Sequence, residues 1–185
     1  MRPIIQFEKT LRNLSSTKHF VYSKYDLRNI FPNITDSNLN MILSRACSKE
    51  ILDRVCKGIY IFDFANFGKP DVLYHVAAKL RSDCFNYISL ETVLCETSYI
   101  SQQMISYLTV MTSGRSGIID CGKFGTIEFV HTAKKIERIS KNLFLDTKSK
   151  MLKAKPVQAY KDMIDAKRTT IELISNEAKK ELSYE

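Results

Sequence analysis

The side chains best suited to a specific chemical task are small polar residues and one arginine that lie close together in the first third of the chain. Asn, Ser and Arg side chains can hydrogen-bond to base edges in the major groove of duplex DNA. The residues concerned are Ser37, Asn38, Asn40, Ser44 and Arg45. Arg54 and Lys57 follow them and are suited to contact phosphates. This set of residues predicts recognition of double-stranded DNA.

A helix is needed to present these side chains together. Leu39, Ile42, Leu43 and Ala46 recur at i, i+3, i+4 and i+7, which predicts one buried face of a helix. Thr35 stands where an N-cap residue would accept a free backbone N–H. The polar residues then lie on the other faces of this helix, with Arg45 as the best candidate to contact a guanine.

Two short β-rich runs follow, Ile51–Cys56 and Ile59–Phe62, and Lys57-Gly58 between them is a hairpin signal. A helix with a polar and basic outer face, followed at once by a basic hairpin, is typical of a winged helix. The alternative interpretation is an ordinary helix and hairpin of a small α+β domain with a solvated polar face.

The residues upstream favour the winged helix-turn-helix. Residues 3–16 predict a first helix with Ile4, Phe7, Leu11 and Leu14 as its apolar stripe. A short extended piece, Phe20–Tyr22, precedes a second helix, for which Ser23 and Asp26 form a capping box and Pro32 marks the end. We therefore expect a winged helix-turn-helix domain over residues 1–65.

A loop signal, Ala65–Pro70, predicts a domain boundary, and residues 68–185 predict a mixed α/β domain. We expect a helix over Asp71–Arg81, helical periodicity from Pro156 to Leu182, and a solvated tail over residues 175–185. Ser89 is predicted to cap another helix. The predicted strands are Asn86–Ser89, Ile105–Met111 and Thr126–His131, and Thr112–Gly125 between the last two is expected to be a loop or irregular hairpin. The fold class predicted for the whole chain is α+β.

No catalytic residue, metal site or cofactor site is assigned, and we expect a protein that is not an enzyme. Gly117–Phe124 approaches a phosphate-binding loop, but Phe124 lacks the hydroxyl that would hold Mg²⁺. The three histidines lie far apart without metal-site spacing. Asp120 and Glu128 are the only acidic pair that resembles part of a nuclease site. Lys134–Lys155 reads most simply as a solvated, lysine-rich surface that adds phosphate contacts in one interpretation.

The charge and cysteine content of the chain restrict the kind of partner and the cellular compartment that we expect. The net charge of +8 favours a polyanionic partner. Five scattered cysteines without C-x-x-C spacing indicate reduced thiols, and no secretory signal or membrane-spanning run is visible. We therefore expect a cytoplasmic protein that does not bind a membrane.

Several motifs in order resemble the AbiEi family, the antitoxins of bacterial type IV toxin–antitoxin systems that act in abortive phage infection. The shared motifs are Phe20–Leu27, Leu43–Arg45 with Gly58–Tyr60, Tyr87–Leu94, Thr109–Gly114, Gly125–His131 and Ala154–Asp162. The resemblance implies an N-terminal winged helix that represses its own operon by binding the operator. It also implies a C-terminal domain that opposes a nucleotidyltransferase-like toxin without forming a stable complex with it.

Two other function classes remain open at this stage. The C-terminal domain would be a nuclease or nucleotide-acting enzyme if Asp120, Glu128 and His131 met in space. The chain would be a protein-interaction module if the polar face of the third helix bound a protein. Repressors of this kind commonly bind as dimers, but no dimerisation helix is evident, so the oligomeric state stays open.

Overall fold

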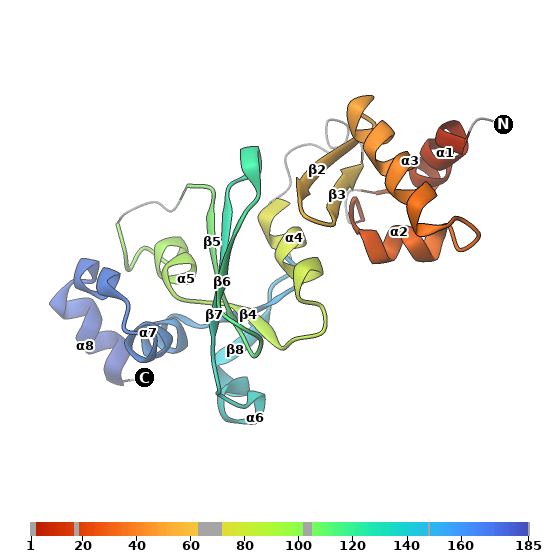
Figure 1. Ribbon diagram of the computed structural model, residues 1–185. Helices are drawn as coiled ribbons and strands as arrows, with labels where there is room; N and C mark the ends of the chain where they lie inside the picture. The colour runs from red at the N-terminus through yellow and green to blue at the C-terminus, as the bar shows by residue number, and fades with distance from the viewer. Residues whose placement is uncertain (1–2, 17–18, 63–71, 102–104, 148, 185) are drawn as a thin grey trace. The chain divides into compact units, whose positions relative to one another are not determined.

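The computed structural model describes residues 3–16, 19–62, 72–101, 105–147 and 149–184, and its fold class is α+β, as predicted (Figure 1). Contacts along the chain divide it into two units, residues 1–72 and residues 73–185. The predicted loop Ala65–Pro70, with the boundary placed in it, lies outside the described residues. Each unit is described by itself.

The first unit follows the predicted order of elements: a helix, a short strand, two helices and a hairpin. The three strands form one antiparallel sheet in the order β1-β3-β2. The element bounds are α1 Pro3–Leu14, β1 Val21–Ser23, α2 Lys24–Ile30, α3 Asp36–Ser48, β2 Leu52–Cys56 and β3 Ile59–Phe62.

Local hydrogen bonds fix where α2 and α3 begin. The Ser23 hydroxyl accepts from the Asp26 N–H at 3.0 Å, and the Asp26 carboxylate accepts from the Ser23 N–H at 2.8 Å, which is the predicted capping box. The Thr35 hydroxyl accepts from the Asn38 N–H at 3.3 Å at the start of α3. Both predicted caps are therefore confirmed.

One apolar core lies between the helices and the sheet of the first unit. The predicted face of α3, consisting of Leu39, Ile42, Leu43 and Ala46, is buried in it. Phe7 and Leu11 of α1 pack in the same core. Leu14, predicted to belong to that stripe, is instead 49% exposed at the end of α1. The core cluster of the first unit includes Phe7 and Leu11 of α1 but not Leu14.

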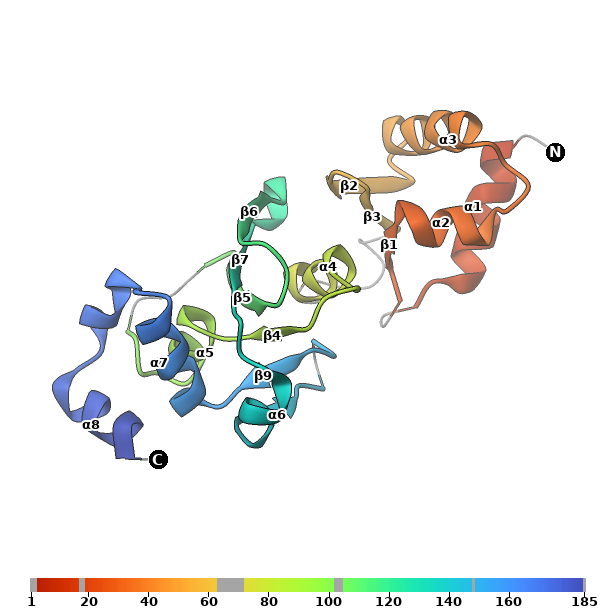
Figure 2. The ribbon, with the colours of Figure 1, turned by 60° about the horizontal axis from the view of Figure 1, so that its bottom comes forward.

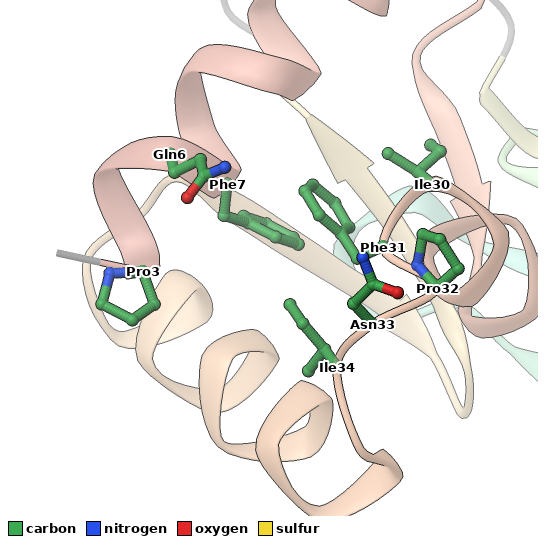
Figure 3. Close-up of a pocket in the computed structure, with 8 residues that line it drawn as sticks. All are labelled: Pro3, Gln6, Phe7, Ile30, Phe31, Pro32, Asn33 and Ile34. Carbon is green, nitrogen blue, oxygen red and sulfur yellow. The ribbon is translucent and has the colours of Figure 1, made fainter. Parts of the chain in front are cut away.

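Aromatic packing ties α1 to the turn between α2 and α3. The rings of Phe7 and Phe31 stack with centroids 4.9 Å apart. They line a pocket of about 330 Å³ that Pro3, Ile34 and neighbouring residues complete (Figure 3). Figure 3 shows Phe7, Phe31 and Ile34 pointing toward one another from α1 and the turn. This packing holds the segment from which α3 starts.

The second unit is built on one mixed sheet with the strand order β6-β7-β5-β4-β9-β8. The pairs β5/β7 and β4/β9 are parallel, and the other neighbours are antiparallel. The strand bounds are β4 Asn86–Ile88, β5 Tyr107–Thr112, β6 Gly117–Asp120, β7 Thr126–His131, β8 Leu143–Leu145 and β9 Leu152–Ala154.

Helices lie on both faces of this sheet. The longer ones are α4 (Val72–Leu80), α7 (Pro156–Asp165) and α8 (Asn176–Tyr184), and the shorter elements are α5 Glu91–Glu96, η2 Gly122–Phe124, α6 Ile136–Ile139, η3 Ser140–Asn142 and η4 Thr169–Leu173. Figures 1 and 2 show α5 and α7 on one face and α4 on the other. The strand β5 in the middle of the sheet is therefore buried on both sides, and its successive residues Leu108 and Thr109, which face opposite sides, are 1% and 0% exposed.

Three predictions for the second unit are wrong. Ser89 does not cap a helix; Leu90 occupies the N-cap of α5 without a side-chain hydrogen bond, and the Ser89 hydroxyl donates to Asp162 instead. Ile105 lies outside β5 and is 80% exposed. The tail expected to be solvated contains α8, which buries Leu182.

The glycine-rich segment Thr112–Gly125 was expected to be a loop or an irregular hairpin. It forms the irregular hairpin, because β6 within it pairs with β7. Gly125 has φ +114°, and a Cβ there would lie 2.1 Å from the Ser106 carbonyl oxygen, so only glycine fits. The lysine-rich segment Lys134–Lys155, for which no regular element was predicted, contains α6, η3, β8 and β9.

The contrast between Leu11 and Leu14 gives a matched test of the first core. Leu11→Ala should lower the free energy of unfolding by about 2–5 kcal/mol, because a fully buried side chain leaves a cavity. Leu14→Ala, in the same helix, should change it by no more than about 0.5 kcal/mol. Urea unfolding followed by circular dichroism measures both; equal losses would contradict the assigned packing.

Candidate nucleic-acid interface

The side chains predicted to read bases all lie on the exposed side of α3. Leu39 and Leu43 face the core at 0% and 2% exposure. The five candidates on the outward side of the helix are exposed: Ser37, Asn38, Asn40, Ser44 and Arg45. Their positions follow from the helical period, because the buried face fixes the rotation of the helix about its own axis.

Within α3, Asn38 and Arg45 stand seven residues apart, so they lie on the same flank of the helix two turns from each other. Asn40 lies on the opposite flank, and Ser37 and Ser44 lie between the two flanks. Met41, which is 47% exposed, also lies between them. The outward side thus combines polar side chains with one apolar side chain, which is suited to contact a thymine methyl group.

Charges at the two ends of α3 differ. At the start, the Asp36 carboxylate forms an ion pair with Arg28 of α2, with 3.4 Å between Oδ1 and Nε. This pairing reduces the repulsion that the carboxylate would exert on DNA. At the end, Lys49 is the C-cap residue and is exposed four residues after Arg45. Sequence reasoning missed Lys49, although its i+4 spacing from Arg45 was a usable signal.

The hairpin places Arg54 and Lys57 at the surface, as the sequence predicts. Arg54 lies opposite Tyr60, and its Nε donates to the Cys56 carbonyl at 3.4 Å, across the register shift in β2. Gly58 takes φ +81°, which closes the two-residue turn. Both cations are exposed, and Lys57 stands at the tip of the hairpin.

The start of α2 lies beside this turn, because the Lys24 N–H donates to the Gly58 carbonyl at 2.8 Å. Tyr25, the next residue, is 75% exposed. The backbone of Lys24 therefore lies next to the hairpin turn that carries Lys57. The sequence carried no signal for this proximity, since it depends on β1 pairing with β3.

Asp120, Glu128 and His131, the residues of the enzyme alternative, form no hydrogen bond or ion pair with one another in the described part of the chain. Ile118, not Asp120, lies opposite Glu128 in the pairing of β6 with β7, and the Asp120 carboxylate accepts from the Gly122 N–H at 2.8 Å. His131 is held by its Nδ1 against the Gly114 carbonyl at 2.8 Å. These three side chains thus have separate local partners.

Glu128 instead belongs to an ion-pair cluster with Arg168 and Glu91. Arg168 contacts Glu91 at 2.6 Å through Nε and Glu128 at 2.6 and 2.9 Å through its two terminal nitrogens. The Tyr107 hydroxyl donates to Glu128 at 2.9 Å. Burial opposes ionisation of Glu128, but the hydrogen bonds from Arg168 and Tyr107 outweigh it and lower the pKa of this carboxyl.

A second buried carboxylate, Asp162 of α7, is also satisfied. It accepts from Ser89 at 2.7 Å, from Gln158 at 2.8 Å and from Lys134 at 2.8 Å, and its side chain is 0% exposed. Burial lowers the pKa of Lys134, but its bonds to Asp162 and Asp165 prevail and raise it. These contacts hold α7 on the sheet, and the charge of Lys134 is paired with Asp162 and Asp165.

Comparison with models of known protein families finds no match, and a search of curated proteins finds no similar sequence. Among the described residues, no helix has the length and apolar character to cross a membrane. In the same residues, His, Cys, Asp and Glu side chains form no group of three or more that could hold a metal ion. The candidate interface therefore stands on the geometry of the first unit.

The Arg168 cluster yields a test of its structural role. Arg168→Met should destabilise the protein by about 3–5 kcal/mol, because it leaves two largely buried carboxylates without their cation. Lys161→Met, an exposed cation on α7, should have little effect. Chemical denaturation of both variants measures the difference, and similar values for the two would remove Arg168 from this role.

The same variant should change the pH dependence of stability. The pKa of Glu128 is lower in the folded protein than in the unfolded chain, so its ionised form stabilises the fold at pH values above the unfolded-state pKa. This stabilisation is lost as the pH falls through the folded-state pKa. Without Arg168, burial raises the pKa of Glu128, so stability is lost as pH rises. The deficit of Arg168→Met should therefore be largest at about pH 7 and shrink toward about pH 4. A constant deficit over that range would contradict the assignment.

Proposed function

We propose that the first unit is a winged helix-turn-helix that binds double-stranded DNA, with α3 in the major groove and the β2–β3 hairpin on flanking phosphates. The observation that carries this proposal is the exposure of all five polar candidates on a helix whose opposite side is buried. A recognition helix needs this division, because its core side must be held rigidly while its other side enters the groove.

The arrangement of elements supports the proposal. The pair α2 and α3 follows the strand β1, and a two-stranded hairpin follows α3 directly. In the proposed complex, Arg45 contacts a guanine, and Ser37, Asn38, Asn40 and Ser44 contact neighbouring base edges. Arg54 and Lys57 contact phosphates, with Lys49 and Lys24 adding further charge.

We further propose that the chain is an antitoxin of the type IV class that represses its own operon in the cytoplasm. This part rests on the resemblance of six ordered motifs to the AbiEi family. The second unit would then oppose a nucleotidyltransferase-like toxin without a stable complex. The pairing of Glu128 with Arg168 and the separate hydrogen bond of Asp120 to the Gly122 N–H favour this interpretation over a nuclease in that unit.

Separate variants distinguish base contacts from phosphate contacts. Arg45→Ala should weaken binding to the operator by roughly 1–3 kcal/mol and relax specificity at one base pair. Lys57→Ala should weaken binding to operator and random duplex alike, and it should flatten the plot of log affinity against log salt by about one unit. Fluorescence anisotropy with a labelled fragment of the upstream region and a scrambled duplex measures both.

Lys9→Ala serves as the control, because it removes one exposed positive charge from α1 of the same unit. Its effect on operator binding should be small and independent of sequence. An equal loss on operator and scrambled DNA for Arg45→Ala would contradict its role in base recognition. Binding that ignores salt would instead favour a protein-interaction module.

The enzyme alternative has its own test. The double variant Asp120→Asn/His131→Ala changes two exposed residues of the second unit. In cells that co-express the cognate toxin, this variant should protect growth as well as the wild type does, because neither side chain performs chemistry. Loss of protection by a variant that remains folded and abundant would support an enzymatic second unit.

A further inference from the structure

Positive charge in the second unit is concentrated in one segment. Residues 134–155 hold eight Lys or Arg and only two acidic residues, whereas the rest of residues 73–185 hold nine basic and eleven acidic residues. This short segment therefore carries all of the net positive charge of the second unit. Such segregation indicates a local field that attracts a polyanion.

Most of the described cations in this segment are not neutralised. Lys134 pairs with Asp162 and Asp165, and Lys153 pairs with Glu96 of α5. The others are exposed and have no ion pair with another described residue: Lys135, Arg138, Lys141, Lys150 and Lys155. Their charges are available to a ligand.

An exposed aromatic ring lies on a strand within this segment. Phe144 is the middle residue of β8, an edge strand of the sheet, and it is 45% exposed. It lies opposite Lys153 of β9. The Lys155 N–H donates to the Asn142 carbonyl at 2.8 Å, so Lys155 is the next residue on the Phe144 side of the hairpin.

We propose that this β8–β9 basic surface, made of Phe144, Lys141, Lys150 and Lys155, binds a single-stranded polynucleotide. An exposed aromatic ring on a strand can stack on a base, and the surrounding cations follow the phosphate backbone. A duplex hides its base faces within the stack, so the ring selects a single strand. This surface belongs to the second unit, and the proposal does not depend on the function proposed for α3 and the β2–β3 hairpin.

A structural role competes with this proposal. Lysines on an edge strand also discourage pairing with another chain, which protects an exposed edge. That role requires charge along the edge but no aromatic ring. A lipid surface is the other polyanion that would meet Phe144 and Leu145, the latter 64% exposed. Both alternatives predict no dependence of polynucleotide binding on the ring.

The test uses the full chain carrying Arg45→Ala, Arg54→Ala and Lys57→Ala, so that the first unit does not mask the measurement. Fluorescein-labelled oligo(dT) and oligo(U), each about 12 nucleotides long, report binding by anisotropy. In this background, Phe144→Ala should weaken binding by about 5- to 100-fold. Leu173→Ala, which truncates another partly exposed apolar side chain of the same unit, should not.

A pair of double variants tests the charges. Lys141→Ala/Lys155→Ala should flatten the slope of log affinity against log salt by about 1.4 units, since each phosphate contact on a single strand contributes about 0.7. Lys161→Ala/Lys180→Ala removes two exposed lysines elsewhere in the second unit and should leave the slope unchanged. Oligo(dT) and oligo(U) together show whether the ligand is DNA, RNA or either.

The proposal stands if both test variants lose binding and both controls keep it. It is overturned if the background protein does not bind either oligonucleotide, if Phe144→Ala binds as well as Leu173→Ala, or if the two double variants behave alike. Binding to vesicles containing phosphatidylserine, without binding to oligonucleotides, would also overturn it and assign the surface to a membrane. None of these outcomes depends on whether α3 binds an operator.

Discussion

The burial of one side of α3 is the constraint on which the first unit depends. Leu39, Leu43 and Ala46 leave water completely or almost completely, and each contributes apolar area that would otherwise cost free energy. This packing fixes the rotation of the helix about its axis, so the polar residues must point outward. The capping bond from Thr35 fixes where the helix begins, and the hairpin after it follows without a long connection.

The second unit depends on a different constraint, which is the pairing of charges that lie under its helices. Arg168 comes late in the chain, yet it binds Glu91 at the start of α5 and Glu128 in the sheet. Lys134 and Asp162 join α7 to the end of β7 in the same way. Burial removes hydration from the charges of each cluster, and only the hydrogen bonds between its members offset that loss, so both clusters favour a single arrangement of helix and sheet.

Charge is distributed differently over the two units. In the first, isolated cations stand on α3 and the hairpin, and the acid at the start of α3, Asp36, is paired with Arg28. In the second, cations concentrate around one edge strand with an exposed aromatic ring. The first pattern suits a partner with a fixed groove, whereas the second suits a flexible polyanion that adapts to a ring and its surroundings.

Local rules in the sequence determined the helices of the first unit, their caps and the hairpin turn. Periodicity and capping depend on residues a few positions apart. Leu39, Ser23 and Gly58 therefore predict a buried helix face, a helix start and a turn from their immediate neighbours alone. Tertiary structure decided the roles of Ser89, Glu128, Tyr25 and Phe144. Ser89 bonds to Asp162 rather than capping a helix, and Glu128 is neutralised by an arginine that lies 40 residues further along the chain. The strand β8 also needed its partner β9, because three residues without periodicity form a strand only when a neighbour supplies the hydrogen bonds.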